Sequence, residues 1–176
     1  MTYGGILRSP YPHARVISID TSEAAAMPGV LAILTPENAP KTKFNVTGSL
    51  PSAILYEDQS VLTMHPRHEG DRIAAIAAED PETLARALDA VKIEYEVLPA
   101  TMTIEEAMTD ERLIDPEFFD SNCFFHKLGT RGDVEEGFRK SDYIFEGTYH
   151  TPTQHPIPME VTSCIAHWDR DDKLTV

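Results

Sequence analysis

The 176-residue chain is 41% hydrophobic and 25% charged, the composition of an ordinary globular domain or of one domain plus part of another. Its net charge of −14 would repel phosphate backbones and anionic lipids, which argues against nucleic-acid and membrane partners. No apolar run approaches the ~20 residues that span a bilayer, and the opening MTYGGILRSP lacks the regions of a signal peptide, so we expect a cytoplasmic protein.

The first elements in chain order are short. YGGILRSPYPHARVISID predicts two strands around a proline-containing turn, because β-branched residues resume after Pro12. EAAAM predicts a short helix that ends at Pro28–Gly29, and VLAIL predicts a third strand. The candidate caps of this helix are Asp20, Thr21 and Ser22.

Residues 39–67 are irregular, with prolines at 40, 51 and 66. We predict a long loop with one short strand near Val61–Leu62. A loop of this length in a compact domain is usually functional or packed against another element.

Regular structure returns at residue 72. The small apolar run Arg72–Ala78 predicts a buried strand. Asp80-Pro81-Glu82 predicts the start of a helix, because the carboxylate accepts from free N–H groups and proline fits the first turn. Leu84, Leu88 and Val91 then share one helix face. The alternating KIEYEVLPA predicts a half-buried strand ended by Pro99.

The last third contains more loop. Thr103–Met108 predicts a capped helix, and residues 109–131 predict a loop with aromatic pairs at 118–119 and 124–125. Asp133 begins another helix, YIFEGTYHT alternates like a strand, and SCIAHW and KLTV predict a hairpin around residues 169–172. Because no regular strand–helix alternation is sustained, the fold class is α+β rather than a doubly wound sheet.

Three stretches carry a recognisable pattern in a fixed order. The first is LRSPYPHARVISIDTSEAAAMPGVLAILT, the second is EGDRIAAIAAEDPETLARALDAVKIEYEVLPA, and the third is GDVEEGFRKSDYIFEGTYHTPTQHPIPMEVTSCIAHWD. Together they resemble the N-terminal part of the molybdenum-binding large subunit of the xanthine dehydrogenase and aldehyde oxidase family. The resemblance covers essentially the whole chain.

The resemblance implies an α/β hammerhead domain over residues 1–125, then a linker and the first strands of a molybdenum-cofactor-binding domain over 126–176. Family members continue for several hundred residues, so we expect a fragment that is inactive alone. The whole enzyme would hydroxylate an N-heterocycle or an aldehyde with oxygen from water. It would use a molybdenum-pterin cofactor, in its cytosine dinucleotide form, and iron–sulfur and flavin (FAD) groups on partner subunits.

The resemblance also marks one residue near the metal. Gln154 occupies the position of a glutamine that hydrogen-bonds an oxygen ligand of molybdenum in xanthine dehydrogenases, counted back from Glu160. A neutral amide can donate to an oxo ligand without changing the charge at the metal. The alternative is a strand-entry amide satisfied by the backbone. We expect structural roles for His155 and Glu160.

Other motifs favour structural interpretations. Pro66 in HPRHE, residues 65–69, argues against a zinc helix. In RGD, residues 131–133, Asp133 is the expected helix cap. We expect Glu105–Glu106 to be solvated, His13 to hold a strand turn, and Cys123 and Cys164 to be buried free thiols.

A second function class stays open from the sequence. A chain of this kind could be a non-catalytic interaction module that kept the hammerhead fold, since fold alone does not imply activity. The substrate is not assigned by any motif, because relatives handle purines, nicotinate, aldehydes and aromatic thioesters.

Overall fold

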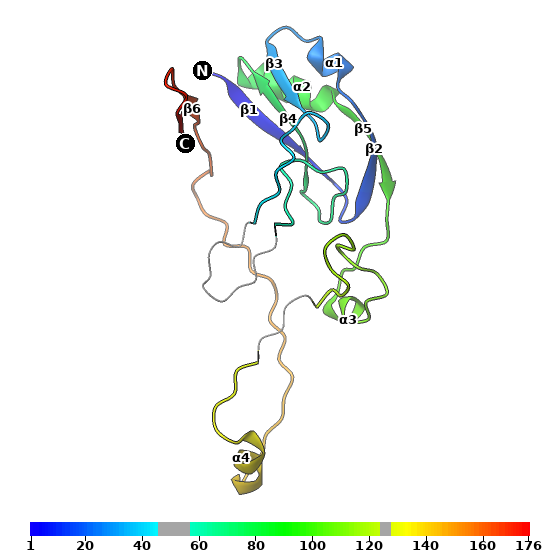
Figure 1. The fold of residues 1–176 in the computed structure, drawn as a ribbon, viewed down its shortest axis with the longest axis vertical. Helices are drawn as coiled ribbons and strands as arrows, with labels where there is room; N and C mark the ends of the chain where they lie inside the picture. The colour runs from blue at the N-terminus through cyan, green and yellow to red at the C-terminus, as the bar shows by residue number, and fades with distance from the viewer. Residues whose placement is uncertain (46–56, 124–127) are drawn as a thin grey trace. The chain divides into compact units, whose positions relative to one another are not determined.

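A computed structural model describes residues 1–45, 57–123 and 128–176 (Figure 1). The chain divides into two compact units, Met1–Lys127 and Leu128–Val176, and each is described by itself. Pro51, the expected pair Phe124–Phe125 and the expected boundary after residue 125 lie outside the described residues. In the described part of the chain, no helix is long and apolar enough to cross a bilayer.

The first unit is built on a three-stranded antiparallel sheet. β4 (Arg72–Ala78) is the central strand, between β1 (Tyr3–Arg8) and β3 (Val30–Leu34). In β4, Ile73, Ala74 and Ala78 are fully buried, which confirms the prediction from its continuous apolar run. A central strand is covered on its faces and bonded on both edges, so its side chains need not alternate with polar residues.

A separate two-stranded ladder pairs β2 (Ala14–Asp20) with β5 (Lys92–Val97) in antiparallel register. Along β5, Ile93 and Tyr95 are half-buried while the charged residues beside them are exposed, which confirms the predicted alternation as far as Tyr95; Val97, the next residue of the pattern, is 57% exposed. The free edge of β2 is occupied by a loop, because Ala14 N donates to Pro66 O at 3.1 Å and Val16 N to Met64 O at 2.8 Å.

Helix α2 (Pro81–Ala90) packs across β1 and β4, with the short α1 (Ser22–Ala25) beside it. Asp80 caps α2 as predicted, since its Oδ1 accepts from Glu82 N and Thr83 N, both at 2.9 Å. Of the three candidate caps of α1, Asp20 supplies the side-chain contact, to Ser22 N at 2.9 Å. The core beneath these helices consists of Ala24, Ile76, Ala87 and Val91, with Leu84 and Leu88 packed against it.

The connection that follows β5 contains α3 (Ile104–Ala107), capped by Thr103 as predicted. Asn122 closes this region into a loop. Its Nδ2 donates to Ala107 O at 3.0 Å and to Arg112 O at 2.9 Å, and its Oδ1 accepts from Ile114 N at 2.8 Å. Residues 107–122 therefore form an internally bonded loop rather than a free tail.

The second unit contains α4 (Val134–Lys140) and the hairpin of β6 (His167–Trp168) and β7 (Leu174–Thr175). Asp133 caps α4, accepting from Glu136 N at 2.9 Å, and the hairpin turn is closed by Asp169, as predicted. The strands of the hairpin are shorter than SCIAHW and KLTV suggested.

Three expectations were wrong. Val61–Leu62 is a bend rather than a strand, and in the described part of this loop the one isolated β-bridge pairs Phe44 with Gln59. Residues 143–151 are extended without being a strand, because no described segment bonds along them. Cys123 and Cys164 are free but exposed, and the apolar residues near Cys164, Val161 and Ile165, are exposed as well.

Candidate functional site

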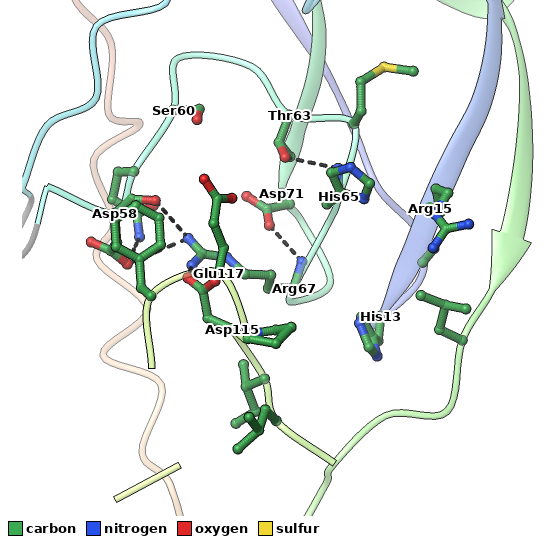
Figure 2. A pocket seen from close by; sticks show the side chains of 18 of the residues that line it. His13, Arg15, Asp58, Ser60, Thr63, His65, Arg67, Asp71, Asp115 and Glu117 are labelled. Atoms are coloured by element: carbon green, nitrogen blue, oxygen red, sulfur yellow. Dashed lines mark hydrogen bonds and ion pairs between the residues drawn. The ribbon is translucent and has the colours of Figure 1, made fainter. Parts of the chain in front are cut away.

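The first unit contains a cleft of about 630 Å³ (Figure 2). The start of β2 forms one wall, the loop of residues 58–67 forms the back, and residues 113–118 form the opposite wall. The charged and polar lining includes His13, Arg15, Asp58, His65, Arg67 and Asp115. The cleft mixes both signs of charge with apolar side chains such as Leu62 and Phe118.

Arg67 is the centre of an ion-pair network in this cleft (Figure 2). Its guanidinium pairs with the carboxylate of Asp115 and donates to Asp58 O at 3.1 Å, with Asp58 Oδ2 at 3.5 Å. Its backbone N–H donates to Asp71 Oδ2 at 2.9 Å. The side chain of Arg67 is 23% exposed and that of Asp115 is 10% exposed. Such a pair is largely removed from water, so breaking it leaves a poorly solvated charge.

Lys43 is a second cation in the lining of the cleft, besides Arg67. Its Nζ lies 2.7 Å from Glu117 Oε1 and 4.2 Å from the centre of the Phe118 ring. The hydrogen bond from Lys43 lowers the pKa of the Glu117 carboxyl, with smaller contributions from nearby His65 and Arg67. Arg67 and Lys43 therefore hold two carboxylates of one turn, Asp115 and Glu117.

The histidines near the cleft have structural partners. His13 Nδ1 lies 2.7 Å from Pro99 O, which ties the start of β2 to the end of β5 and agrees with the expected structural role. His68 Nδ1 lies 3.2 Å from Asp71 Oδ2. Among the described residues, no group of three or more His, Cys, Asp or Glu side chains could hold a metal ion, so HPRHE forms no such centre there.

The residues singled out by the resemblance lie in the second unit, in the extended stretch between α4 and β6. Gln154, His155 and Glu160 are exposed, and their side chains have no hydrogen-bond or ion-pair partner among the described residues. The amide of Gln154 therefore has free donors. The roles of Gln154, His155 and Glu160 stay predictions.

The backbone close to Gln154 is strained. Ile157 has φ +42°, in the left-handed region, and stands between Pro156 and Pro158. A β-branched side chain disfavours this region, and the following proline disfavours it further.

Two further motifs have the structural roles expected of them. Asp133 of the RGD sequence is a helix cap, with Glu135 and Glu136 in the first turn of α4. Glu105 and Glu106 are exposed, and Glu106 also accepts from Met102 N at 2.9 Å, which reinforces the start of α3.

Sequence reasoning missed Arg67 and Asp115. HPRHE was considered for its histidines, yet the arginine between them makes the long-range contacts. The available signal was Asp115-Pro116-Glu117, a turn sequence with two acids within a predicted loop. A turn sequence does not identify its partner, because that partner is set by tertiary structure.

Comparison with known proteins decides the family. A family model described as "Aldehyde oxidase and xanthine dehydrogenase, a/b hammerhead domain" matches residues 1–99, and one described as "Molybdopterin cofactor-binding domain" matches residues 116–176. The chain belongs to the aldehyde oxidase and xanthine dehydrogenase family. Within this family, the first unit carries the hammerhead match, and the second unit lies inside the cofactor-binding match.

Relatives in this family include two bacterial proteins. The chain is 37% identical to a probable xanthine dehydrogenase subunit of Bacillus subtilis and 34% identical to "Nicotinate dehydrogenase large molybdopterin subunit" of Eubacterium barkeri, in each case over all of this chain. It spans 23% of the first relative and 40% of the second. The solved aldehyde oxidoreductase from Desulfovibrio desulfuricans aligns with 80% of this chain and 16% of its own, at 26% identity and a TM-score of 0.64.

Proposed function

We propose that this chain is part of the molybdenum subunit of an enzyme that hydroxylates an N-heterocycle or an aldehyde with oxygen from water. The observation that carries the proposal is the order of the two matches in one chain, hammerhead over 1–99 and molybdopterin cofactor-binding domain over 116–176. The division into a hammerhead domain at 1–125 and a cofactor-binding region at 126–176 belongs to this proposal.

The residues present fit a pterin-held molybdenum at one point. Gln154 offers two amide N–H donors without a partner among the described residues, and a neutral donor suits an oxygen ligand of a metal. When bound, the cofactor supplies the two-electron oxidation chemistry, and the protein supplies orientation and hydrogen bonds. In this proposal Gln154 would be the residue of this chain that holds the cofactor's oxygen ligand, through one of its amide N–H groups, and Glu160 would keep a structural role.

The proposal includes partners and a cofactor form. The two bacterial relatives are named as subunits, which supports assembly with other chains. We infer iron–sulfur and flavin partner subunits, a cytosine dinucleotide form of the pterin and a small-molecule substrate. Most cofactor contacts would lie outside these 176 residues, since the chain spans 23% of the Bacillus relative. We therefore infer that the 176-residue chain alone is inactive and holds no molybdenum.

The direct test follows oxygen. The assembled enzyme that carries this segment is purified, its molybdenum is measured by mass spectrometry, and N-heterocycles and aldehydes are supplied with an artificial electron acceptor in ¹⁸O-labelled water. Label in the product supports a hydroxylase. An assembly that contains no molybdenum, or a product that takes its oxygen from O₂, would refute the proposal.

Gln154 is tested within the same enzyme. Gln154→Ala is expected to lower kcat/KM about 10- to 100-fold with molybdenum content retained, as for other outer-shell partners of a metal. His155→Ala is the matched control, one residue away in the same extended stretch, and it is expected to have little effect. Equal losses in both variants would contradict the role of the Gln154 amide.

A further inference from the structure

One turn of the first unit presents two acidic side chains that are both held by cations. The amides of Phe118 and Phe119 donate to Asp115 O at 3.2 and 3.0 Å, which closes the turn. From it, the Asp115 carboxylate pairs with Arg67 and the Glu117 carboxylate with Lys43. The two cations come from a distant part of the sequence.

Arg67 connects two segments of the first unit. Arg67 also reaches Asp58, so one guanidinium bridges the loop of residues 58–67 and the turn. Asp58 is 22% exposed and Asp115 is 10% exposed, so both acids depend on Arg67 for compensation of their charge. A guanidinium presents several donors in a rigid fork, which allows such a bridge.

Lys43 holds the same turn through a second carboxylate, that of Glu117. Phe44, next to Lys43, is bridged to Gln59, next to Asp58, by backbone bonds of 2.9 and 3.0 Å. The backbones that carry the two pairs are therefore joined to each other. The Lys43 pair is more exposed than the Arg67 pair, with Glu117 at 72%, so salt should screen it more strongly.

This turn also lies where the second domain match begins. The match to the cofactor-binding domain begins at residue 116, between Asp115 and Glu117. The bonds made by Asn122 close residues 107–122 as a loop, so fastening the turn also fastens the chain that leads toward the second unit.

We propose that Arg67 and Lys43 form an ionic clasp that anchors residues 115–117, where the match to the cofactor-binding domain begins, to the rest of the first unit, with Arg67 as a positioning residue. The anchoring role rests on the proposed function, because a cofactor-binding region must be held in place to be positioned. The clasp itself is a property of the first unit and can be measured without any cofactor.

The first measurement is hydrogen exchange at the Phe118 and Phe119 amides of the 176-residue chain. Lys43→Met and Glu117→Gln are each expected to speed exchange about 2- to 5-fold, as loss of a partly exposed pair allows. Arg67→Met is expected to speed it more than about 10-fold, because it leaves buried acids unpaired. The matched controls are Lys92→Met and Lys140→Met, which break exposed pairs that do not involve the turn or the lining of the cleft.

A charge exchange separates a specific pair from general loosening. Lys43→Glu and Glu117→Lys are each expected to speed exchange, and the double variant is expected to restore most of the protection. The amides of β4 report on the whole unit and should keep their wild-type rates. The clasp is refuted if Lys43→Met and Glu117→Gln match the controls, or if exchange rises equally in β4.

The positioning role is then measured in the assembled enzyme. Arg67→Met is expected to lower kcat and molybdenum content relative to Lys92→Met, while Arg67→Lys recovers part of both. Unchanged values in Arg67→Met would overturn the positioning role. If wild-type enzyme lacked molybdenum, the proposed function would fail while the exchange result still decided the clasp. If exchange were unaffected, the clasp would fail while the oxygen-label result stood.

Discussion

Gly5 of β1 lies directly against side chains of helix α2. A Cβ atom at Gly5 would lie 2.8 Å from Leu88 Cδ1 and 3.3 Å from both methyl groups of Leu84. At the neighbouring Gly4, a Cβ would meet nothing within 4 Å. Neither glycine has a positive φ, so alanine is compatible with both backbones. The two positions therefore differ in packing alone.

The expected magnitude follows from this difference. Each Gly→Ala change gains about 0.4–1 kcal/mol by restricting the unfolded chain, and this gain cancels between the two variants. Overpacking a core costs about 1–3 kcal/mol. The nearest atoms are terminal methyl groups that can turn aside, so we expect Gly5→Ala to be less stable than Gly4→Ala by about 1 kcal/mol, the low end of that range. This corresponds to a difference in Tm of roughly 4 °C.

The assay is urea unfolding of the 176-residue chain, followed by circular dichroism for both variants and the wild type. A double variant, Gly5→Ala with Leu88→Ala, identifies the clash, because removing the nearest methyl group should make the two changes cost less together than separately. The packing argument is refuted if Gly5→Ala is as stable as Gly4→Ala. If the free-energy changes of the two single variants simply added in the double variant, the side chain of Leu88 would not be the source of the clash.

Three other outcomes follow from the same structure. Asp80→Ala should destabilise the chain above pH 4, and Asp80→Asn should do so much less. Hydrogen bonds from Thr83 lower the pKa of Asp80, so the stability that its carboxylate adds is present above the ordinary pKa of 3.8 and is lost as pH falls through the lower pKa of the folded state. Unfolding measured over a pH series checks this. Burial raises the pKa of Tyr95 above 10.0, so the stability that its neutral phenol adds is complete below pH 10 and is lost as pH rises through the raised pKa. Ultraviolet titration of the wild type against Tyr95→Phe measures this pKa. Ile73 is fully buried, so Ile73→Val should cost about 0.5–1.5 and Ile73→Ala about 2–5 kcal/mol in urea unfolding.

Elements with a strong local signal could be predicted from the sequence. The start of α2 at Asp80-Pro81 needs only a capping carboxylate and the fixed φ of proline, and both are local properties of the sequence. In the structure Asp80 caps the helix and Pro81 is its first residue. The apolar run of β4 and, up to Tyr95, the alternation in β5 were likewise sufficient. In these elements the secondary structure and the burial follow from the same few residues.

Prediction failed where burial depends on a second layer. Residues 143–151 alternate like a strand, yet Tyr143, Phe145 and Tyr149 are exposed, because no described segment supplies a bonded neighbour. An alternating pattern says which side chains would share a face if a partner strand were present. The apolar surroundings of Cys164 gave the same error, since apolar neighbours in sequence do not cover a thiol in space.

The contacts of Arg67 and Lys43 could not be predicted for a related reason. Lys43 and Glu117 are separated by 74 positions, and nothing local to either residue selects the other. Charge pairs at such separation form only after the sheet has brought their loops together, and in water each side chain alone is satisfied by solvent. The composition predicted an acidic surface with few Lys and Arg side chains. With 15 Lys and Arg against 29 acids, a cation held by two acids, as Arg67 is by Asp58 and Asp115, is costly to lose, because few other cations remain to replace it.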